Sequence, residues 1–588
     1  MNIRLITPIL VGFLLSALIL NAQAVTIKDA KITQNPNPRV PLAWICTFKT
    51  DVPAKISAVL FNGRERLMLP TKKGYATDHE IIVLGVRPGR ENMLGFIAID
   101  EIGTKSDAER LKWTVGPLPE EMPVMDVYAA DPKRMEPGIT LIPCNRWSLK
   151  GLYDITFGAL LGLNAYGDVV WSYQTDHTIV EAKPLKNGNL LIHYGREGHV
   201  MEIDMLGNTV RRWHTTLIPK KYYEGSIPIE AQTIHHEVLE MPNGNFMALS
   251  TEVRYFERYP DSEFDPDVPE YPAYVVGDVI IEYKPDGTIV KQIKLLDLLD
   301  AKRIGYDSLS QGFWSDIYYE RGLLSARPVD WSHANSLDYN PNDNTLLVSI
   351  NHQDAVIKID YETGKVKWVM GYPSDWRGTL KLKLLKPTGE GHFFFHQHTA
   401  RMTPVGTMML FDNGSYRARP FEPRLKSDKN FSRVVEFEID EKNNEYKEVW
   451  SYGGRQGEYF FSPILSEAEW LPRTQNVLIT DGARIRRPDG TTGGHPKQGK
   501  EWARVLEVTR TKPAEKVFEV VLDDPKWGWT IYRSERIPSL YPKGATLVPK
   551  ALPENIKMLS IGVEQIKQNG LPEIQETDEE ALDSLPYL

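Results

Sequence analysis

A short pattern of polar turns and alternating strands recurs along most of the chain. Each instance is a turn rich in Gly, Asn or Asp, followed by a strand in which apolar and polar residues alternate, as in a β-hairpin. Six segments carry this pattern: NAYGDVVWSY, DMLGNTVRRWH, KPDGTIVKQIK, DYETGKVKWVM, DEKNNEYKEVWSY and TRTKPAEKVFEV. The alternation predicts six outer hairpins between residues 164 and 520.

A second pattern, a strand, a Pro/Asn/Gly turn and a strongly apolar strand, precedes most of these hairpins, as in AKPLKNGNLLIHY, LEMPNGNFMALS, LDYNPNDNTLLVSI, ARMTPVGTMMLF and EWLPRTQNVLIT. Each unit then has four antiparallel strands, and six units predict an all-β fold, a six-bladed β-propeller, over residues 126–550. The first unit, from about Gly138, lacks its innermost strand, and we expect residues 530–541 to supply it and close the ring. Insertions at 252–276 and 301–330 read as long loops, which usually build a site on one face.

The segments outside the repeats have different sequence patterns. Residues 1–24 combine a short positive start, an apolar stretch and the small-residue site AQA, which predicts a signal peptide cut before Val25 and export to a periplasm. Residues 25–125 alternate and turn like a small β-sandwich of the fibronectin type III kind. No later stretch is apolar enough to cross a membrane. Residues 551–588 form an acidic C-terminal tail.

Composition adds two limits. The 588 residues are 41% hydrophobic and 25% charged, which is typical of a globular protein. The net charge of −9 argues against a nucleic-acid partner, because such proteins usually carry a basic face. The two cysteines, Cys46 and Cys144, provide no thiolate metal site, and the sequence leaves open whether they pair.

Polar residues recur at one position of the repeat. His236, Asn335 and His398 each lie eight residues before a turn residue of their unit, at the start of a predicted innermost strand. His333 lies two positions before Asn335 and so shares its face of the strand. Innermost strands line the central channel, so we expect these four side chains to meet at one end of it. The remaining histidines of this region we assign to packing or the surface: His352, His392 and His396.

Two chemistries suit such a group of histidines. Imidazole binds several transition metals, but few acidic residues accompany these histidines, and we expect no metal. Alternatively, an imidazole nitrogen attacks an electrophilic centre and is later regenerated. The other His and Asn side chains then stabilise anionic oxygens or protonate a leaving group.

Three motifs, DWSHANSLDYNPNDNTLLVSINHQDAVIKID, QHTARMTPVGTMMLFDNG and HHEVLEMPNGN, resemble those of bacterial arylsulfate sulfotransferases, over most of residues 25–545. The resemblance implies a periplasmic, homodimeric six-bladed propeller. It implies sulfuryl transfer from a phenolic sulfate donor to a phenolic acceptor, without a nucleotide donor or other cofactor. It also implies that His398 is the nucleophile that becomes sulfated, that His333 and Asn335 contact the sulfuryl oxygens, and that His236 is a further catalytic histidine.

The chain departs from the family pattern at one substrate-binding position. Asn351 stands where the family has an arginine, so the charge and the bidentate fork are absent. Either another cation such as Arg417 or Arg401 compensates, or the activity is weaker or different. Thr399, within QHT, and His235, beside His236, are further candidate substrate-binding residues. A cysteine pair that some family members carry before the QHT strand is absent here.

Two other functions remain open from the sequence. One is a non-catalytic envelope propeller that acts as a binding scaffold. The other is a metal-dependent hydrolase that uses the same histidines. Aromatic residues at Phe393–Phe395 and Tyr416 either stack on an aryl substrate near the mouth of the channel or serve in packing.

Overall fold

The computed structural model describes residues 24–551 apart from 197, 221–222, 390–392, 455–457 and 544–546, so the predicted signal peptide and acidic tail lie outside it. The described residues form two compact units, a smaller one within the ranges 1–33, 45–83 and 92–113 and a larger one within 34–44, 84–91 and 114–588. Among the described residues, no helix has the length and apolar character needed to span a membrane.

The smaller unit is one hydrogen-bonded sheet built around a single long strand. Its strands run in the order β1 (Ile27–Gln34), β2 (Trp44–Phe61), β5 (Glu91–Asp100) and β6 (Glu109–Thr114), with β3 (Arg66–Leu69) and β4 (Ala76–Val83) also paired to β2. A two-layer sandwich stays a prediction. Cys46 on β2 and Cys144 in the larger unit are both buried, and neither forms a disulfide.

In the described part of the larger unit there are six sheets. The first consists of β8 (Ile139–Trp147), β9 (Gly158–Leu163), β10 (Val169–Thr175), β34 (Gly528–Ile531) and β35 (Glu535–Ile537). The second consists of β11 (Glu181–Pro184), β12 (Leu190–Tyr194), β13 (His199–Ile203), β14 (Thr209–Thr215) and β15 (Ile227–Ile229). The third consists of β16 (His235–Glu240), β17 (Phe246–Tyr259), β18 (Tyr271–Tyr283), β19 (Ile289–Lys294) and β20 (Val329–Asp330).

The remaining three sheets follow in chain order. The fourth consists of β21 (Ala334–Asn340), β22 (Thr345–Ile350), β23 (Ala355–Asp360) and β24 (Val366–Gly371). The fifth consists of β25 (Lys386–Pro387), β26 (His398–Met402), β27 (Met408–Asp412), β28 (Arg433–Asp440) and β29 (Glu445–Gly453). The sixth consists of β30 (Glu467–Trp470), β31 (Val477–Arg486), β32 (Lys500–Val508), β33 (Lys516–Leu522) and β7 (Asp126–Ala130).

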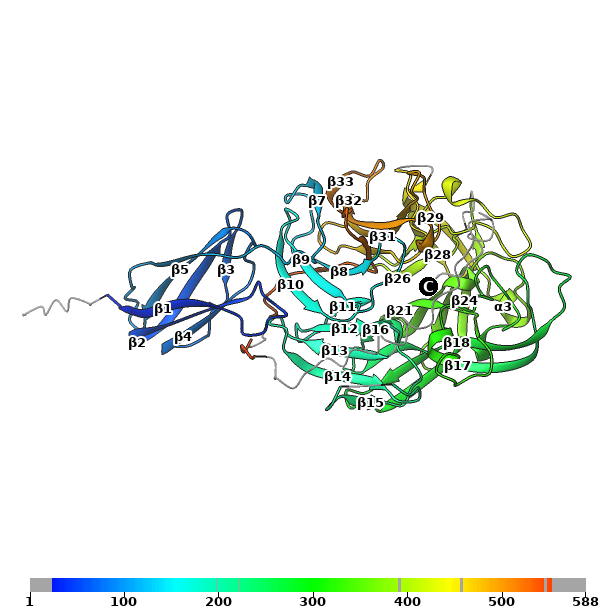
Figure 1. Cartoon of the computed structure of the whole chain (residues 1–588), viewed down its shortest axis with the longest axis horizontal. Helices are drawn as coiled ribbons and strands as arrows, with labels where there is room; N and C mark the ends of the chain where they lie inside the picture. The colour runs from blue at the N-terminus through cyan, green and yellow to red at the C-terminus, as the bar shows by residue number, and fades with distance from the viewer. Residues whose placement is uncertain are drawn as a thin grey trace, which may run out of the picture. The chain divides into compact units, whose positions relative to one another are not determined.

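The hairpins predicted from the two sequence patterns are all present as antiparallel pairs. The first strands of the second to sixth sheets, β11, β16, β21, β26 and β30, contact one another in that order. From β30 the contacts continue to β31 and then to β34, and β35, which pairs with β8 as β34 does, contacts β11, so the circuit is closed. Figure 1 shows β11, β16, β21 and β26 gathered at the centre, with β14, β29 and β33 farther out. The larger unit is therefore a propeller-like all-β fold in which the first strands surround a common centre.

Segments from the two ends of the larger unit complete its first and last sheets. β34 and β35 pair antiparallel with β8, from Gly528 opposite Trp147 to Ile537 opposite Ile139. This confirms that the stretch around 530–541 supplies the strand that the first sequence unit lacks. At the other end, β7 adds to the outer edge of β33.

The expectation of a long loop at 252–276 is wrong, because β17 and β18 extend through most of it as a hairpin. Pairing continues to Tyr259 opposite Tyr271. Alternation in TEVRYFERY supports the strand, and the rings of Tyr255 and Tyr274 pack across the two strands with centroids 5.3 Å apart. The 301–330 insertion holds the short helix α2 (Ser315–Tyr318) and ends in β20, which pairs with β18 in parallel.

Buried apolar layers lie between consecutive sheets. One layer joins the third and fourth sheets around Trp331 and Leu346, and another joins the fourth and fifth around Val356 and Phe437. Close packing of this kind holds neighbouring sheets at fixed positions. The first residues of β16, β21 and β26 are therefore presented to one another by rigid elements.

Candidate active site

The histidine site begins where three first strands lose their regular pairing. A β-bulge interrupts the ladder after His235 on β16, after Ala334 on β21 and after His398 on β26. His236 and Asn335 lie within these bulges, whereas His398 keeps its ladder partner, Phe411. His236, Asn335 and His398 lie the same number of residues before the turn. Their pairing with the neighbouring strand differs, because the bulges begin at different positions. Bulges re-aim side chains and are common beside active sites.

The structure brings the rings of His236 and His333 together, with centroids 4.8 Å apart. His352 stacks on His333 at 4.5 Å, and His396 follows at 6.1 Å from His352. His398 and His236 flank the same Tyr532 ring, at 6.2 and 5.9 Å. The sequence assigned His352 and His396 to packing or the surface, but in the structure they continue the row of rings.

His398 is held as a neutral imidazole in one tautomer. Asn413 donates from Nδ2 to the carbonyls of Ser462 and Leu465, at 2.8 and 3.0 Å, so its Oδ1 must face His398. His398 Nδ1 donates to that oxygen at 2.8 Å, which leaves the lone pair on Nε2. Burial, with the positive charge of Arg533 among the further causes, lowers the pKa of His398 to about 3. Its Nε2 is therefore an unprotonated, potentially nucleophilic nitrogen.

The environment of His333, unlike that of His398, favours the protonated imidazole. Asp330 Oδ2 lies 2.5 Å from His333 Nδ1, while Asp330 Oδ1 accepts from Trp314 Nε1 at 2.9 Å. Burial alone would lower the pKa of His333, but the Asp330 carboxylate outweighs it and the pKa is raised. The main-chain carbonyl of Asp330 also accepts from His352 Nδ1 at 2.6 Å, so one residue orients both rings. His333 is suited to carry a proton on the nitrogen that faces away from Asp330.

His236 is neutral and fixed by its neighbour. Its Nδ1 lies 2.7 Å from Nδ1 of His235, whose Nε2 faces the carbonyl of Ser250 and the carboxylate of Asp278, both at 3.2 Å. Burial and the nearby histidines, His333 first, lower the pKa of His236 well below its ordinary value. His235, a candidate substrate-binding residue, therefore orients His236 through these contacts.

A buried arginine that the sequence did not single out lies beneath this group. Arg533 donates from Nη1 to Glu181 and Glu237, at 2.8 and 2.5 Å, and from Nη2 to the main-chain carbonyl of Asn335. Its guanidinium lies 4.8 Å from the ring centroid of Tyr532. Arg533 places a permanent positive charge close enough to His398 to depress the pKa of that ring.

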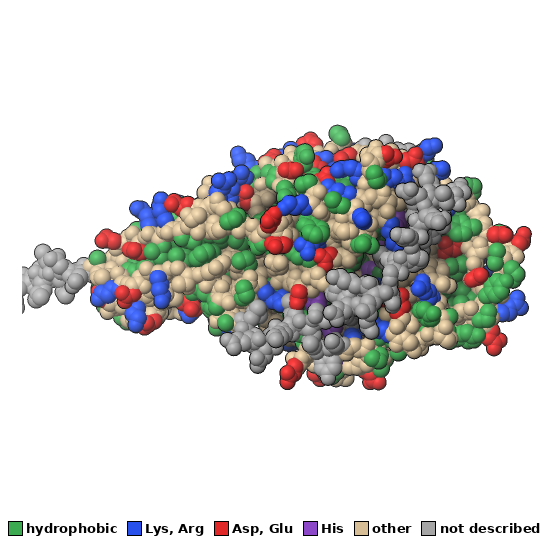
Figure 2. Space-filling view, in the orientation of Figure 1, with side chains coloured by type: hydrophobic (Ala, Val, Ile, Leu, Met, Phe, Trp, Pro, Cys, Tyr) green, Lys and Arg blue, Asp and Glu red, His purple; other side chains and the backbone are tan. Residues whose placement is uncertain are grey.

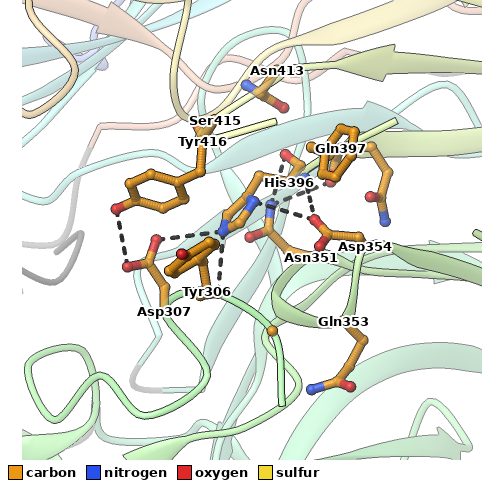
Figure 3. A network of polar contacts seen from close by, with 12 residues as sticks. Tyr306, Asp307, Asn351, Gln353, Asp354, His396, Gln397, Asn413, Ser415 and Tyr416 are labelled. Atoms are coloured by element: carbon orange, nitrogen blue, oxygen red, sulfur yellow. Dashed lines mark hydrogen bonds and ion pairs between the residues drawn. The ribbon is translucent and has the colours of Figure 1, made fainter. Parts of the chain in front are cut away.

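His396 and Gln397 anchor the segment that leads to His398 (Figure 3). His396 lies between two carboxylates, with Nε2 3.4 Å from Asp307 and Nδ1 3.2 Å from Asp354, and its T-shaped contact with Tyr416 is 5.3 Å between centroids. Burial opposes its charge, but the two carboxylates raise the pKa of His396 to about 10. In the HQH motif, the first histidine is a cation locked in place and the second is a neutral base.

The other three predicted substrate-binding residues are held by contacts within the protein. Asn351 donates to the carbonyls of His396 and Gln397, at 2.9 and 3.3 Å. Thr399 is fully buried and donates to the carbonyl of Ser466 at 3.3 Å. Arg417 pairs with Asp412 at 3.1 Å, donates to the carbonyl of Phe431 at 2.7 Å and stacks over the Phe431 ring. These contacts support the loops around the histidines.

Of the aromatic residues named from the sequence, Tyr416 lies against His396, whereas Phe393 and Phe394 serve in packing. Phe394 is buried in the apolar layer against Phe437, and Phe393 packs on Tyr372. Instead, Phe313 lies over the histidines, 4.6 Å from His333 and 5.7 Å from His236. Phe313 belongs to the 301–330 insertion, which the sequence indicated as a site-building segment, but without a repeat pattern nothing in it singled out Phe313.

One group within the site has the donor set of a metal centre. Ligand atoms of Asp330, His333 and His352 all lie within 4.8 Å of one another. One carboxylate and two imidazoles suit Zn²⁺ and related ions. The 2.5 Å contact between Asp330 and His333 uses two of these atoms for a hydrogen bond.

Comparison with known proteins gives one family. Residues 126–533 match the arylsulfotransferase (ASST) family. The arylsulfate sulfotransferase AssT of Escherichia coli O6:H1 is 27% identical over 364 residues, 56% of this chain and 55% of the relative. The arylsulfate sulfotransferase AssT of Lelliottia amnigena is 37% identical over 295 residues, 43% of this chain and 48% of the relative. The chain spans about half the length of the curated relatives it matches.

Similarity to solved structures is weak. A putative 6-phosphogluconolactonase from Bacteroides uniformis has a TM-score of 0.31 and 11% identity, covering 82% of this chain and 99% of its own. A TM-score this low supports no conclusion.

Proposed function

The chain belongs to the arylsulfotransferase family, and from this premise we propose that it transfers a sulfuryl group from a phenolic sulfate ester to an acceptor phenol. The observation that carries the proposal is the neutral His398, held by Asn413 with its Nε2 lone pair available. We propose a ping-pong reaction without a nucleotide donor or other cofactor.

In the first half-reaction, His398 Nε2 attacks the sulfur and the bond between sulfur and the phenolic oxygen breaks. The electron pair of that bond leaves on the phenolate, and the sulfuryl group stays on His398. His333, protonated with the help of Asp330, gives its proton to the phenolate, and the donor departs as a phenol.

In the second half-reaction, neutral His333 takes the proton of the acceptor phenol, whose oxygen attacks the sulfuryl group and frees His398. His236, Asn335 and the charge of Arg533 stabilise the negative oxygens in both steps. Arg533 then serves in place of the arginine that Asn351 replaces, because its positive charge already acts on His398.

The same proposal covers the organisation of the chain. The circuit of first-strand contacts supports a six-bladed propeller over residues 126–550, with the mouth of its channel at the histidine site. We propose a sandwich for residues 25–125, a signal peptide for 1–24, and a periplasmic homodimer, as the family resemblance implies. On the face shown in Figure 2, basic side chains are interspersed with acidic ones, which fits a small-molecule substrate better than a polyanion.

The test is turnover of a chromogenic phenyl sulfate, with and without added phenol. We expect release of the chromophore to accelerate with phenol, and His398→Asn to lose both turnover and the sulfuryl label. Mass spectrometry after brief exposure should find about 80 Da, one sulfuryl group, on the peptide that carries His398. An active His398→Asn variant, together with a wild-type protein that never carries the label, would falsify the mechanism.

A second function is favoured by the Asp330, His333 and His352 group, namely metal-dependent hydrolysis of the ester. It predicts that a chelator abolishes turnover, that added Zn²⁺ restores it and that phenol has no effect. A protein with no turnover under any of these conditions would instead be a binding scaffold.

A further inference from the structure

A second polar cavity lies in the larger unit and shares no residue with the histidine site. It leaves about 20 Å³ of free space between the segment of residues 34–44, the first sheet and the second sheet. Its walls include two arginines, Arg39 and Arg212, and three tyrosines, Tyr173, Tyr194 and Tyr223. That space is enough for one particle the size of a water molecule.

The charge in this cavity is unbalanced. Among the residues that the structure describes, no carboxylate lines it. Arg39 donates to the carbonyl of Gln174 at 3.3 Å, and Arg212 contacts Thr209 Oγ1 at 3.4 Å and stacks over Tyr223 at 3.9 Å. By contrast Arg211, which precedes Arg212 on β14, forms an ion pair with Glu202 at 2.6 Å. Two partly buried guanidiniums that form no ion pair with any described carboxylate are unusual, because desolvated charges are normally paired.

The remaining polar groups also suit a negative ligand. The hydroxyls of Tyr173 and Tyr194 lie 3.3 Å apart, so only one of them donates to the other and one hydroxyl proton is left to point elsewhere. His199 is buried at the cavity wall. Burial first, and then Lys220, two neighbouring histidines and Arg212, lower the pKa of His199 to about 3. The charged side chains that line the cavity are therefore the two guanidiniums.

We propose that this cavity binds a halide-sized inorganic anion, such as chloride, between Arg39 and Arg212. The anion would accept hydrogen bonds from both guanidiniums and from a tyrosine hydroxyl. It would neutralise two like charges and so join the segment of residues 34–44 to β10, β12 and β14. Sulfate is larger than a halide, and a comparison of the two anions tests how closely the walls fit the ligand.

The experiment uses the full chain in a chloride-free buffer of constant ionic strength. Thermal unfolding is followed while sodium gluconate is exchanged for sodium bromide, and separately for sodium sulfate. We expect a saturable rise in Tm of roughly 2 °C with bromide, because a ligand that binds only the folded state stabilises it. The rise should be absent in Arg212→Gln and smaller in Arg39→Gln.

Arg211→Gln is the matched control, since it removes a guanidinium from the same strand but not from the cavity. Its bromide response should equal that of the wild type. Crystals soaked in bromide should show anomalous scattering between Arg39 and Arg212, a readout that does not depend on any variant folding. The proposal is overturned if bromide leaves Tm unchanged, if only sulfate raises it, if Arg212→Gln responds like the wild type, or if no bromide occupies the cavity.

Discussion

Backbone conformation at single residues marks the histidine site. His236, His333, His396 and Thr399 have φ values of 57°, 45°, 50° and 53°, in the left-handed region that disfavours side chains. Such residues cost on the order of 1–3 kcal/mol each and persist only where surrounding contacts impose them. Here the imposing contacts are the bulges and the buried hydrogen bonds of His235, Asp330 and Asp354.

Replacement of Asp330 should change the pH dependence of the reaction. The carboxylate raises the pKa of His333, so Asp330→Asn should lower it. The alkaline limb of the kcat/KM profile, where His333 loses its proton, should then move to lower pH, with about a 10- to 100-fold loss of rate at pH 8.

A purely structural role for Asp330 would reduce the rate equally at all pH values and leave the limb in place. Trp314→Phe is a suitable control, because it removes the other hydrogen bond of Asp330 but leaves the carboxylate beside His333.

Glu501 is a buried carboxyl outside the site with no hydrogen bond to either oxygen among the described residues. Burial raises its pKa from 4.5 to about 8. As the pH rises between these values, the unfolded chain releases the proton while the folded state retains it, so folding stability falls across this window. Glu501→Gln should therefore be more stable than the wild type at pH 9, by about 1–3 kcal/mol, and lose this advantage at pH 4.

Urea unfolding at the two pH values measures the effect. An equal difference in midpoint at pH 4 and pH 9 would show that ionisation of Glu501 is not the cause.

At the scale of strands and turns, a feature could be predicted from the sequence when the residues that determine it are close together in the chain. The hairpins were predictable because Gly, Asn and Asp turns and alternating strands lie within a dozen residues of one another. The bulges were not, because an extra residue in a ladder depends on the partner strand. Strict alternation placed His333 and Asn335 on one face, but the left-handed backbone at His333 and the bulge at Asn335 set their directions instead.

β31 lies very close to the last residue of β34, so adding one methyl group to β31 tests this contact. A Cβ atom at Gly482 would lie 1.9 Å from the carbonyl oxygen of Ile531. Gly482→Ala should therefore destabilise the protein by about 1–3 kcal/mol or more, because the backbone of one strand must move.

Gly116→Ala is the control, since its Cβ would meet nothing within 4 Å and its backbone is not left-handed. Equal thermal stability of the two variants would mean that β31 and β34 are not in close contact.

At the scale of the whole chain, charged residues from several sheets meet at the centre of the larger unit. Glu181, Glu237 and Glu467 alternate with Lys183, Arg401 and Arg533. Most of these pairings were not predictable, because all but the pair of Lys183 with Glu181 join residues far apart in the chain. The position of Arg533 was missed for the same reason, whereas the repeat register predicted that His236, His333 and His398 lie close together, as the structure has them.

Loss of Arg533 should affect stability as well as rate. Arg533→Met leaves Glu181 and Glu237 buried with one cation fewer, which typically costs about 3–5 kcal/mol. The double variant Arg533→Met, Glu237→Gln should recover part of this loss, as a urea-unfolding cycle would show.

Lys447→Met is the comparison, because its pair with Glu438 is exposed and worth at most about 1 kcal/mol. A similar loss for both variants would contradict a special role for the central charges.

The joining of β8 to β34 and β35 has a consequence for synthesis of the chain. β8, β9 and β10 leave the ribosome early, but the strands that complete their sheet are among the last to emerge. Until then the inner edge of β8 is unpaired. During most of its elongation, a newly made chain therefore exposes backbone groups that can pair with a strand of another chain. Completion of the larger unit must therefore wait for residues 528–537, and nascent chains that stop short of them are expected to aggregate or to recruit chaperones.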